Sequence, residues 1–198
     1  MNRLWIIFIL AFTTCSALGQ TPKSRGTPNS EEALVQSLYD LVVTRHPIGI
    51  PDGDDKGVFM PYLSQKLLHK IDLFRACDAD WLRRNPDPNL KPPFGVFESG
   101  IFSGGDERSE PRTFQVESTQ AEKDGSHRVY VKLTWGKPSM SPQLIWRVAV
   151  VIVHEKSSFA VDDVIYLKDK DHDVEWSLSK SLSYQCDGPR WVGSDQKR

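Results

Sequence analysis

The sequence predicts a single α+β domain in which helices precede an antiparallel β-sheet along the chain. Apolar residues recur every three or four positions between residues 30 and 81, as they do on one face of a helix. From residue 114 onward they recur at every second position, as they do on one face of a strand. The chain has 198 residues and no internal repeat, which suits one hydrophobic core. Helices followed by strands are typical of a layered α+β fold.

Residues 1–19 have the pattern of a secretory signal peptide, with Arg3 at the start, an apolar segment from Leu4 to Phe12 and small residues near a cleavage site. The apolar segment is shorter than the roughly 20 residues that cross a bilayer. We therefore expect an exported protein, periplasmic or secreted after cleavage near Gly19/Gln20, without a stable membrane span. The alternative, lipidation of Cys15, lacks the small residue that lipoprotein processing needs just before the cysteine.

The domain is predicted to begin at Ser30, after a flexible leader at residues 20–29 that is polar and contains proline and glycine. Ser30 can cap a helix, and the two glutamates that follow suit the positive end of the helix dipole. This helix is expected to end near His46, because Pro47 disfavours its continuation. Its apolar positions are Leu34, Leu38, Leu41 and Val42.

A turn-rich connection at residues 51–57 is predicted to lead to a longer helix that opens around Pro61, a residue suited to a first helical turn. The prolines of residues 85–93 end this helix. Steps of three and four residues give it one apolar stripe, made of Leu63, Leu67, Ile71, Phe74, Cys77 and Trp81.

The strand patterns that follow predict an antiparallel meander, with Asp124 and Gly125 as the first turn. Its segments are 114–117, 128–135, 144–153 and 159–167. The third segment is apolar on both faces and is expected to be a central, covered strand. A short, partly amphipathic segment at 177–191 completes the domain, which spans residues 30–191, and residues 192–198 are expected to be a flexible tail.

Two cysteines remain after removal of the signal peptide, Cys77 and Cys186, and we expect them to form a disulfide in an oxidising compartment. The bond would tie the C-terminal segment to the second helix. The loop that it closes is long, and the chain-entropy model gives up to about 4.7 kcal/mol for such a loop. The alternative is two buried free thiols.

Composition and spacing exclude several classes of function. The formal net charge is −1 with mixed charges along the chain, which argues against binding to nucleic acid or an anionic membrane. The five histidines lack zinc spacing, and the acidic runs at 52–57 and 169–175 fail the calcium-loop template, so no metal or cofactor is predicted. No nucleophile elbow or phosphate-binding loop is present.

Asp162 and Asp163 are the candidate catalytic carboxylates, because neighbours on a strand point to opposite faces. Asp163 falls on the same face of the predicted strand as three apolar residues. It is therefore favoured as the carboxylate that points into the interior. In an apolar interior its pKa would rise, and it would serve as a general base with Tyr130 or Tyr166 as a hydrogen-bond donor. The alternative is a carboxylate satisfied by backbone amides, by Arg147 or by a tyrosine hydroxyl.

The tryptophans are candidates for a ligand pocket, although most large aromatic residues belong to a core. Trp135 and Trp146 are best placed to face the inner side of the sheet. Together with Tyr166 and Asp163 they form the predicted binding set.

The order of elements resembles the nuclear transport factor two-like superfamily: an N-terminal helix, a second helix containing Cys77 to Trp81, and a sheet that ends in residues 159–164. The segment Leu178 to Trp191, which includes Cys186, is similar to exported bacterial proteins of the family domain of unknown function 3828. The resemblance covers residues 30–191. It implies a curved sheet that forms a cone with the helices, around a pocket that members use for catalysis, binding or dimerisation.

We therefore expect an exported, non-catalytic envelope protein that binds a small ligand or a protein partner through the cone-shaped pocket or a sheet face. An interbacterial immunity or accessory protein is one form of this expectation. The alternative is a small-molecule isomerase, dehydratase or hydrolase with Asp163 as general base. The resemblance also allows a homodimer through the open sheet face.

Overall fold

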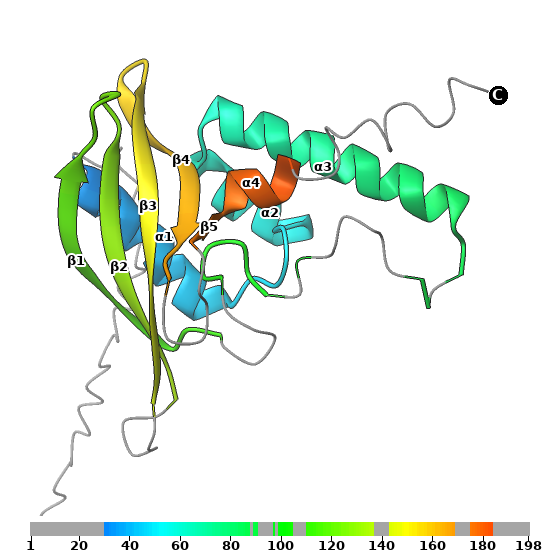
Figure 1. Ribbon diagram of the computed structural model, residues 1–198, viewed down its shortest axis with the longest axis horizontal. Helices are drawn as coiled ribbons and strands as arrows, with labels where there is room; N and C mark the ends of the chain where they lie inside the picture. The colour runs from blue at the N-terminus through cyan, green and yellow to red at the C-terminus, as the bar shows by residue number, and fades with distance from the viewer. Residues whose placement is uncertain are drawn as a thin grey trace, which may run out of the picture.

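The computed structural model describes residues 30–87, 89–90, 97, 99–104, 110–136, 143–168 and 175–183. Within these residues the chain forms one α+β domain with an antiparallel sheet, as the sequence predicted (Figure 1). The sheet has five strands, one more than the sequence predicted, because Trp176–Ser177 adds a short strand after the fourth. The elements are α1 (Glu31–Arg45), α2 (Gly53–Phe59), the 3₁₀ helix η1 (Met60–Tyr62), α3 (Gln65–Arg84), β1 (Thr113–Ala121), β2 (His127–Trp135), β3 (Leu144–Glu155), β4 (Ser158–Tyr166), β5 (Trp176–Ser177) and α4 (Leu178–Ser183).

The first helix has the predicted boundaries. The hydroxyl oxygen of Ser30 accepts a hydrogen bond from Ala33 N at 3.2 Å, and two glutamates occupy the first turn. At the other end, His46 adopts a φ of 49°, the left-handed conformation that terminates many helices. Local capping chemistry thus sets both ends of α1.

A helix, α2, occupies the segment that the sequence assigned to turns, so that prediction is wrong. Two glycines in this segment weaken the helical signal, and the helix depends on tertiary contacts of Phe59, which is fully buried. Pro61 lies in η1 rather than in the following helix. The long helix α3 begins after Ser64, whose hydroxyl oxygen accepts a hydrogen bond from Leu67 N at 3.0 Å.

The strands follow one another across the sheet in sequence order, which confirms the predicted meander. The β1–β2 turn contains Asp124 and Gly125, and Gly125 has a φ of 86° that suits a glycine. Bulges interrupt the pairing of β1 with β2 and of β4 with β3. At each bulge one residue has no opposite residue on the neighbouring strand. These residues are Glu117 in β1 and Asp162 in β4, and both are acidic.

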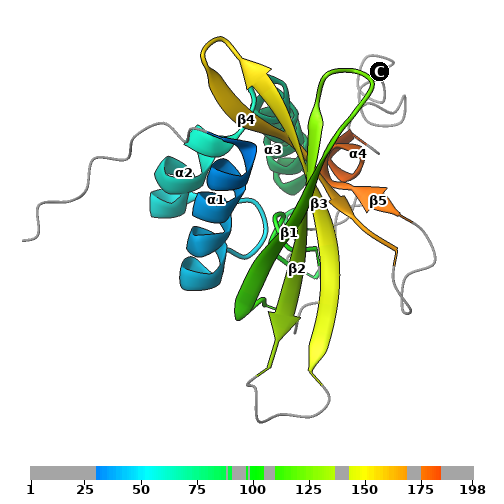
Figure 2. The same cartoon turned by 90° about the vertical axis from the view of Figure 1, so that its left-hand side faces the viewer.

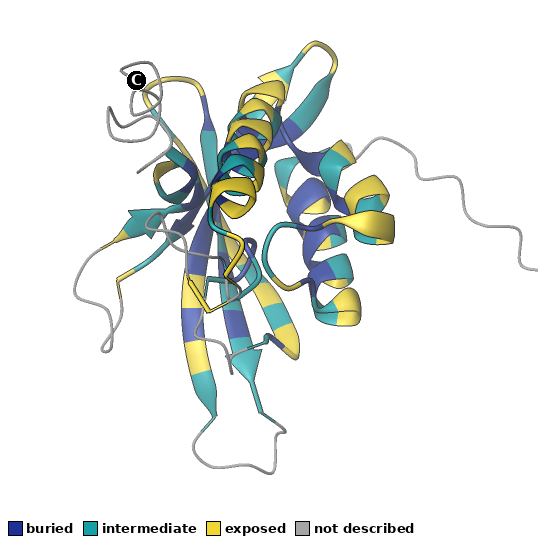
Figure 3. Cartoon of the chain, turned by 90° about the vertical axis from the view of Figure 1, so that its right-hand side faces the viewer, coloured by how far each residue is buried: buried dark blue, intermediate teal, exposed yellow. Residues whose placement is uncertain are grey.

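The helices α1 and α2 lie on one side of the sheet (Figure 2), whereas α3 starts beside β4 and extends away from it (Figure 1). Buried residues gather where the strands pass behind α3 and beside α1 (Figure 3). The core contains, from the helices, Leu34, Val35, Leu38, Tyr39, Val42, Phe59, Leu67 and Ile71, and, from the strands, Val129, Val131, Leu133, Trp146, Val148, Val150, Ile152, Val161 and Val164.

The second face of the sheet is less covered. On the central strand β3, Ala149 is buried, Val151 and Val153 are half-buried, and Ile145 is 48% exposed. The expectation that both faces of this strand are covered is therefore wrong for its second face.

The predicted signal peptide at 1–19, the leader at 20–29, the tail at 192–198 and Cys186 lie outside the described residues. Cys77 is half-buried on α3 and forms no disulfide with a described residue. None of the helices in the described part of the chain is long and apolar enough to cross a membrane.

Candidate functional site

The carboxylate of Asp162 holds the first turn of α3 against the sheet. Asp162 is 9% exposed; its Oδ1 accepts a hydrogen bond from Ser64 Oγ at 2.7 Å, and its Oδ2 accepts one from Lys66 Nζ at 2.5 Å. Beside it, Gln65 N donates a hydrogen bond to Glu155 Oε1 at 3.1 Å. The hydrogen bond with Asp162 raises the pKa of the Lys66 ammonium. These contacts stabilise the positive end of α3 with two carboxylates.

Asp163 caps the shorter helix α4. Its Oδ1 accepts hydrogen bonds from the backbone N–H groups of Val164 and Ser179, both at 2.8 Å, and its Oδ2 accepts one from the Ser179 hydroxyl at 2.6 Å. The sequence favoured Asp163 as the inward carboxylate, but Asp162 is the more buried of the two. The bulge is the reason, because an unpaired residue in a strand breaks the alternation of its two faces.

The other partners weighed for Asp163 are engaged elsewhere. Arg147 forms a bidentate ion pair with Glu117, with Nε–Oε2 and Nη2–Oε1 distances of 2.9 and 3.1 Å. Hydrogen bonding in this pair lowers the pKa of Glu117 and raises that of Arg147. The hydroxyl of Tyr130 donates a hydrogen bond to Gln120 Oε1 at 3.3 Å. Backbone amides and a serine hydroxyl therefore satisfy Asp163.

Three aromatic side chains donate hydrogen bonds to the carbonyl groups of the consecutive residues 101–103. Tyr166 Oη donates to the carbonyl of residue 101 at 2.8 Å, and Tyr39 Oη donates to that of residue 102 at 2.6 Å. Trp146 Nε1 donates to the carbonyl of residue 103 at 2.8 Å. The donors come from β4, α1 and β3. Burial raises the pKa of both tyrosines, so they remain neutral donors at physiological pH.

Ile101 and Phe102 fill the interior between the helices and the sheet at this point. They are 1% and 0% exposed, and the Phe102 ring stacks on Phe59 with 5.2 Å between the ring centroids. Gly104, with a φ of 65°, packs so closely that a Cβ there would lie 2.3 Å from Tyr166 Cδ1. The chain itself thus occupies the space next to two of the predicted binding residues.

The predicted binding set does not form one cluster. Trp146 and Tyr166 contact the same segment, as described, whereas Asp163 caps α4. Trp135 is half-buried at the end of β2, where it pairs with Leu144 of β3.

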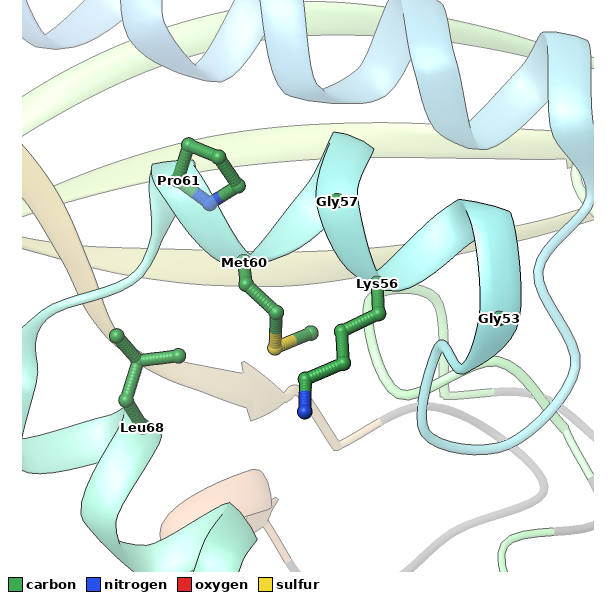
Figure 4. A pocket seen from close by; sticks show the side chains of 6 residues that line it. All are labelled: Gly53, Lys56, Gly57, Met60, Pro61 and Leu68. Atoms are coloured by element: carbon green, nitrogen blue, oxygen red, sulfur yellow. The ribbon is translucent and has the colours of Figure 1, made fainter.

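A shallow groove lies between α2, η1 and the first turns of α3 (Figure 4). Its volume is about 520 Å³, and its lining consists of Gly53, Lys56, Gly57, Met60, Pro61 and Leu68. The side chains of Lys56, Met60 and Leu68 point into the same space (Figure 4). A Cβ built at Gly53 or Gly57 would meet no atom within 4 Å, so the side of α2 that lines the groove is open.

Hydrogen bonds hold the segments that flank the groove elements in place. Ser64, directly before α3, donates its backbone N–H to Val161 O on β4 at 2.8 Å. About three turns along α3, Arg75 Nη2 donates to Pro51 O, just before α2, at 2.5 Å. The sequence reasoning missed the groove because it did not predict α2. The four-residue spacing of two glycines, which places both on one helix face, is the signal that could have indicated it.

Within the described part of the chain, histidine, cysteine, aspartate and glutamate side chains do not gather in groups of three or more that could hold a metal ion. Most of the acidic run at 169–175 lies outside the described residues. A scan against protein-family models, a search of curated proteins and a search of solved structures each found no match to this chain.

Proposed function

We propose that this protein is an exported, non-catalytic binding protein of the cell envelope and that the groove between α2 and α3 is its ligand site. The groove carries the proposal, because it is an apolar hollow between α2, η1 and α3 with an open glycine-lined side. Sites for small ligands are concave, mostly apolar and largely pre-formed, with volumes of about 300–1,000 Å³. The signal-peptide pattern of residues 1–19 supports export.

The enzymatic alternative, an isomerase, dehydratase or hydrolase with Asp163 as general base, has weaker support. Asp163 accepts three hydrogen bonds that cap a helix. Its candidate partners, Tyr166 and Tyr130, donate hydrogen bonds to the carbonyl of Ile101 and to Gln120 Oε1. The candidate base and both candidate donors thus have structural partners, and none of the three is among the residues that line the groove.

Membership of the nuclear transport factor two-like superfamily also remains a proposal. The order of helices and antiparallel strands supports it. An immunity or accessory protein is the form of the proposal in which a segment of a protein partner occupies the groove.

We further propose a disulfide between Cys77 and Cys186. Lys70 Nζ of α3 donates to Ser183 Oγ at 2.5 Å, which places the end of α4 beside α3. Cys77 lies on the same helix face as Lys70, seven residues or about 10 Å along the axis. Cys186 follows Ser183 by three residues, a length of chain that spans up to about 10 Å. The distance along α3 therefore matches the reach of the chain.

Native mass spectrometry tests the proposed site. Wild-type protein and the Gly57→Trp variant are purified from the envelope fraction of the native host without denaturing steps. We expect an additional mass on the wild-type protein and its loss from the variant, in which an indole ring fills the groove. A bare mass for both proteins, or an additional mass retained by the variant, would contradict the proposal.

A further inference from the structure

We infer that the groove between α2 and α3 binds the alkyl chain of a monomeric anionic amphiphile, such as a fatty carboxylate, with the headgroup beside Lys56. This inference rests on the proposed function and names the ligand class of the same site. Two features of the groove support it: the apolar character of its walls and the ammonium group of Lys56, the one charged group among the described lining residues.

Among the described residues, the walls offer hydrocarbon surface and no side-chain carboxylate, amide or hydroxyl. Met60 and Leu68 are half-buried and face each other across the groove from η1 and α3 (Figure 4). Methionine is flexible and polarizable, and it adapts to irregular apolar ligands. Gly53 and Gly57 allow a ligand to approach the backbone of α2 closely. An alkyl chain satisfies such walls, whereas a polar ligand body would lose its hydrogen bonds to water.

The charge on the groove is free to pair with a ligand. Lys56 is exposed and forms no ion pair or side-chain hydrogen bond with another described residue. The adjacent carboxylate of Asp55 is engaged by Arg45 Nη1 at 2.9 Å. Asp54 precedes Lys56 by two residues and therefore lies on a different side of the helix. Asp52, the N-cap residue four positions before Lys56, lies on the same side, but its carboxylate forms no ion pair with Lys56. The Lys56 ammonium and the Met60 thioether reach over the same hollow (Figure 4). An anionic head on an apolar tail complements this pair.

The small number of basic residues at the groove favours binding of a single free molecule over binding to a membrane surface. Recognition of an anionic membrane by electrostatics requires a cluster of basic residues. Among the described residues, one lysine lines the groove, and no basic cluster surrounds it.

Isothermal titration calorimetry with dodecanoate below its critical micelle concentration tests the inference. We expect one molecule to bind wild-type protein, and Lys56→Gln to weaken binding roughly two- to fivefold, as for the loss of an exposed ion pair. Dodecanol should bind wild-type protein as weakly as dodecanoate binds Lys56→Gln. Lys123→Gln, which removes an exposed lysine at the β1–β2 turn, is the matched control and should bind dodecanoate like wild-type protein.

Gly57→Trp should reduce dodecanoate binding at least tenfold while retaining the wild-type melting temperature, because an added Cβ meets open space. Met60→Gln, of similar length, is a second variant that should also weaken binding. Unchanged affinity in both variants, equal affinity of wild-type protein for dodecanol and dodecanoate, or binding to phosphatidylglycerol vesicles but not to monomeric dodecanoate would overturn the inference. A different result is a native envelope ligand that binds wild-type protein but not Gly57→Trp, and that resists displacement by dodecanoate. That result would overturn the inference about the ligand class and leave the proposed function intact.

Discussion

Gly104→Ala should destabilise the protein by about 2–5 kcal/mol, because two costs coincide at this residue. Gly104 has a φ of 65°, and this left-handed conformation costs a residue with a Cβ about 1–2 kcal/mol. The new Cβ would also lie 2.3 Å from Tyr166 Cδ1, far inside van der Waals contact, so the ring must move. Overpacking of this kind costs about 1–3 kcal/mol. A moved ring would also strain the hydrogen bond from Tyr166 Oη to Ile101 O.

Gly125→Ala is the matched control for this variant. Gly125 has a φ of 86° but no atom within 4 Å of its Cβ position, so the control carries the backbone cost alone, about 1–2 kcal/mol. Urea unfolding followed by tryptophan fluorescence gives the free energy of unfolding of each variant. Gly104→Ala should be the less stable by at least about 1 kcal/mol. Equal stability of the two variants would refute the packing of residues 101–104 against Tyr166.

Asp163→Asn should lower the free energy of unfolding by about 0.5–2 kcal/mol, because it weakens the cap of α4; a variant as stable as wild-type protein would argue against this role. The ion pair with Arg147 lowers the pKa of Glu117, so its stabilisation is fully present above the unfolded-state pKa of about 4.3 and is lost as pH falls through the lower folded-state pKa. Glu117→Gln should therefore make the urea midpoint less sensitive to pH below about 5, and an unaltered pH dependence would contradict the pair. For the disulfide, alkylation should modify neither Cys77 nor Cys186 before reduction and both after it, as measured by intact mass; two alkylated thiols in the unreduced protein would exclude the bond.

Sequence patterns predicted helix ends well where a single residue carries the signal. Ser30 and Pro47 bracket α1 because capping and proline sterics are local effects. The helix α2 has no such signal, since its two glycines lower helix propensity and its stability comes from the burial of Phe59 in the tertiary structure. The start of α3 was misplaced for a related reason: Pro61 suits a first turn, but the hydroxyl of Ser64 supplies the cap.

At the candidate site, the alternation of strand residues between two faces did not predict correctly which carboxylate points inward. Alternation along β4 favoured Asp163 as the inward carboxylate, and it assumed an uninterrupted strand. The bulge at Asp162 shifts the register and brings the two neighbours to different helices. A bulge depends on pairing with the next strand, so the residues of β4 alone do not reveal it. The hydrogen bonds of Tyr166 and Trp146 to residues 101–103 were equally hidden, because their partners lie far away in the sequence.

Two-dimensional ¹H–¹⁵N NMR determines whether the groove between α2 and α3 is the ligand site. The ¹⁵N-labelled protein is titrated first with dodecanoate and then with an organic extract of the native host's envelope. We expect the amide signals of Gly53 and Gly57 to shift with the extract while those of Gly104 and Gly125 stay in place. Shifts at Gly104 without shifts at Gly53 and Gly57 would place the ligand in the interior beside Tyr166 and exclude the groove as the ligand site.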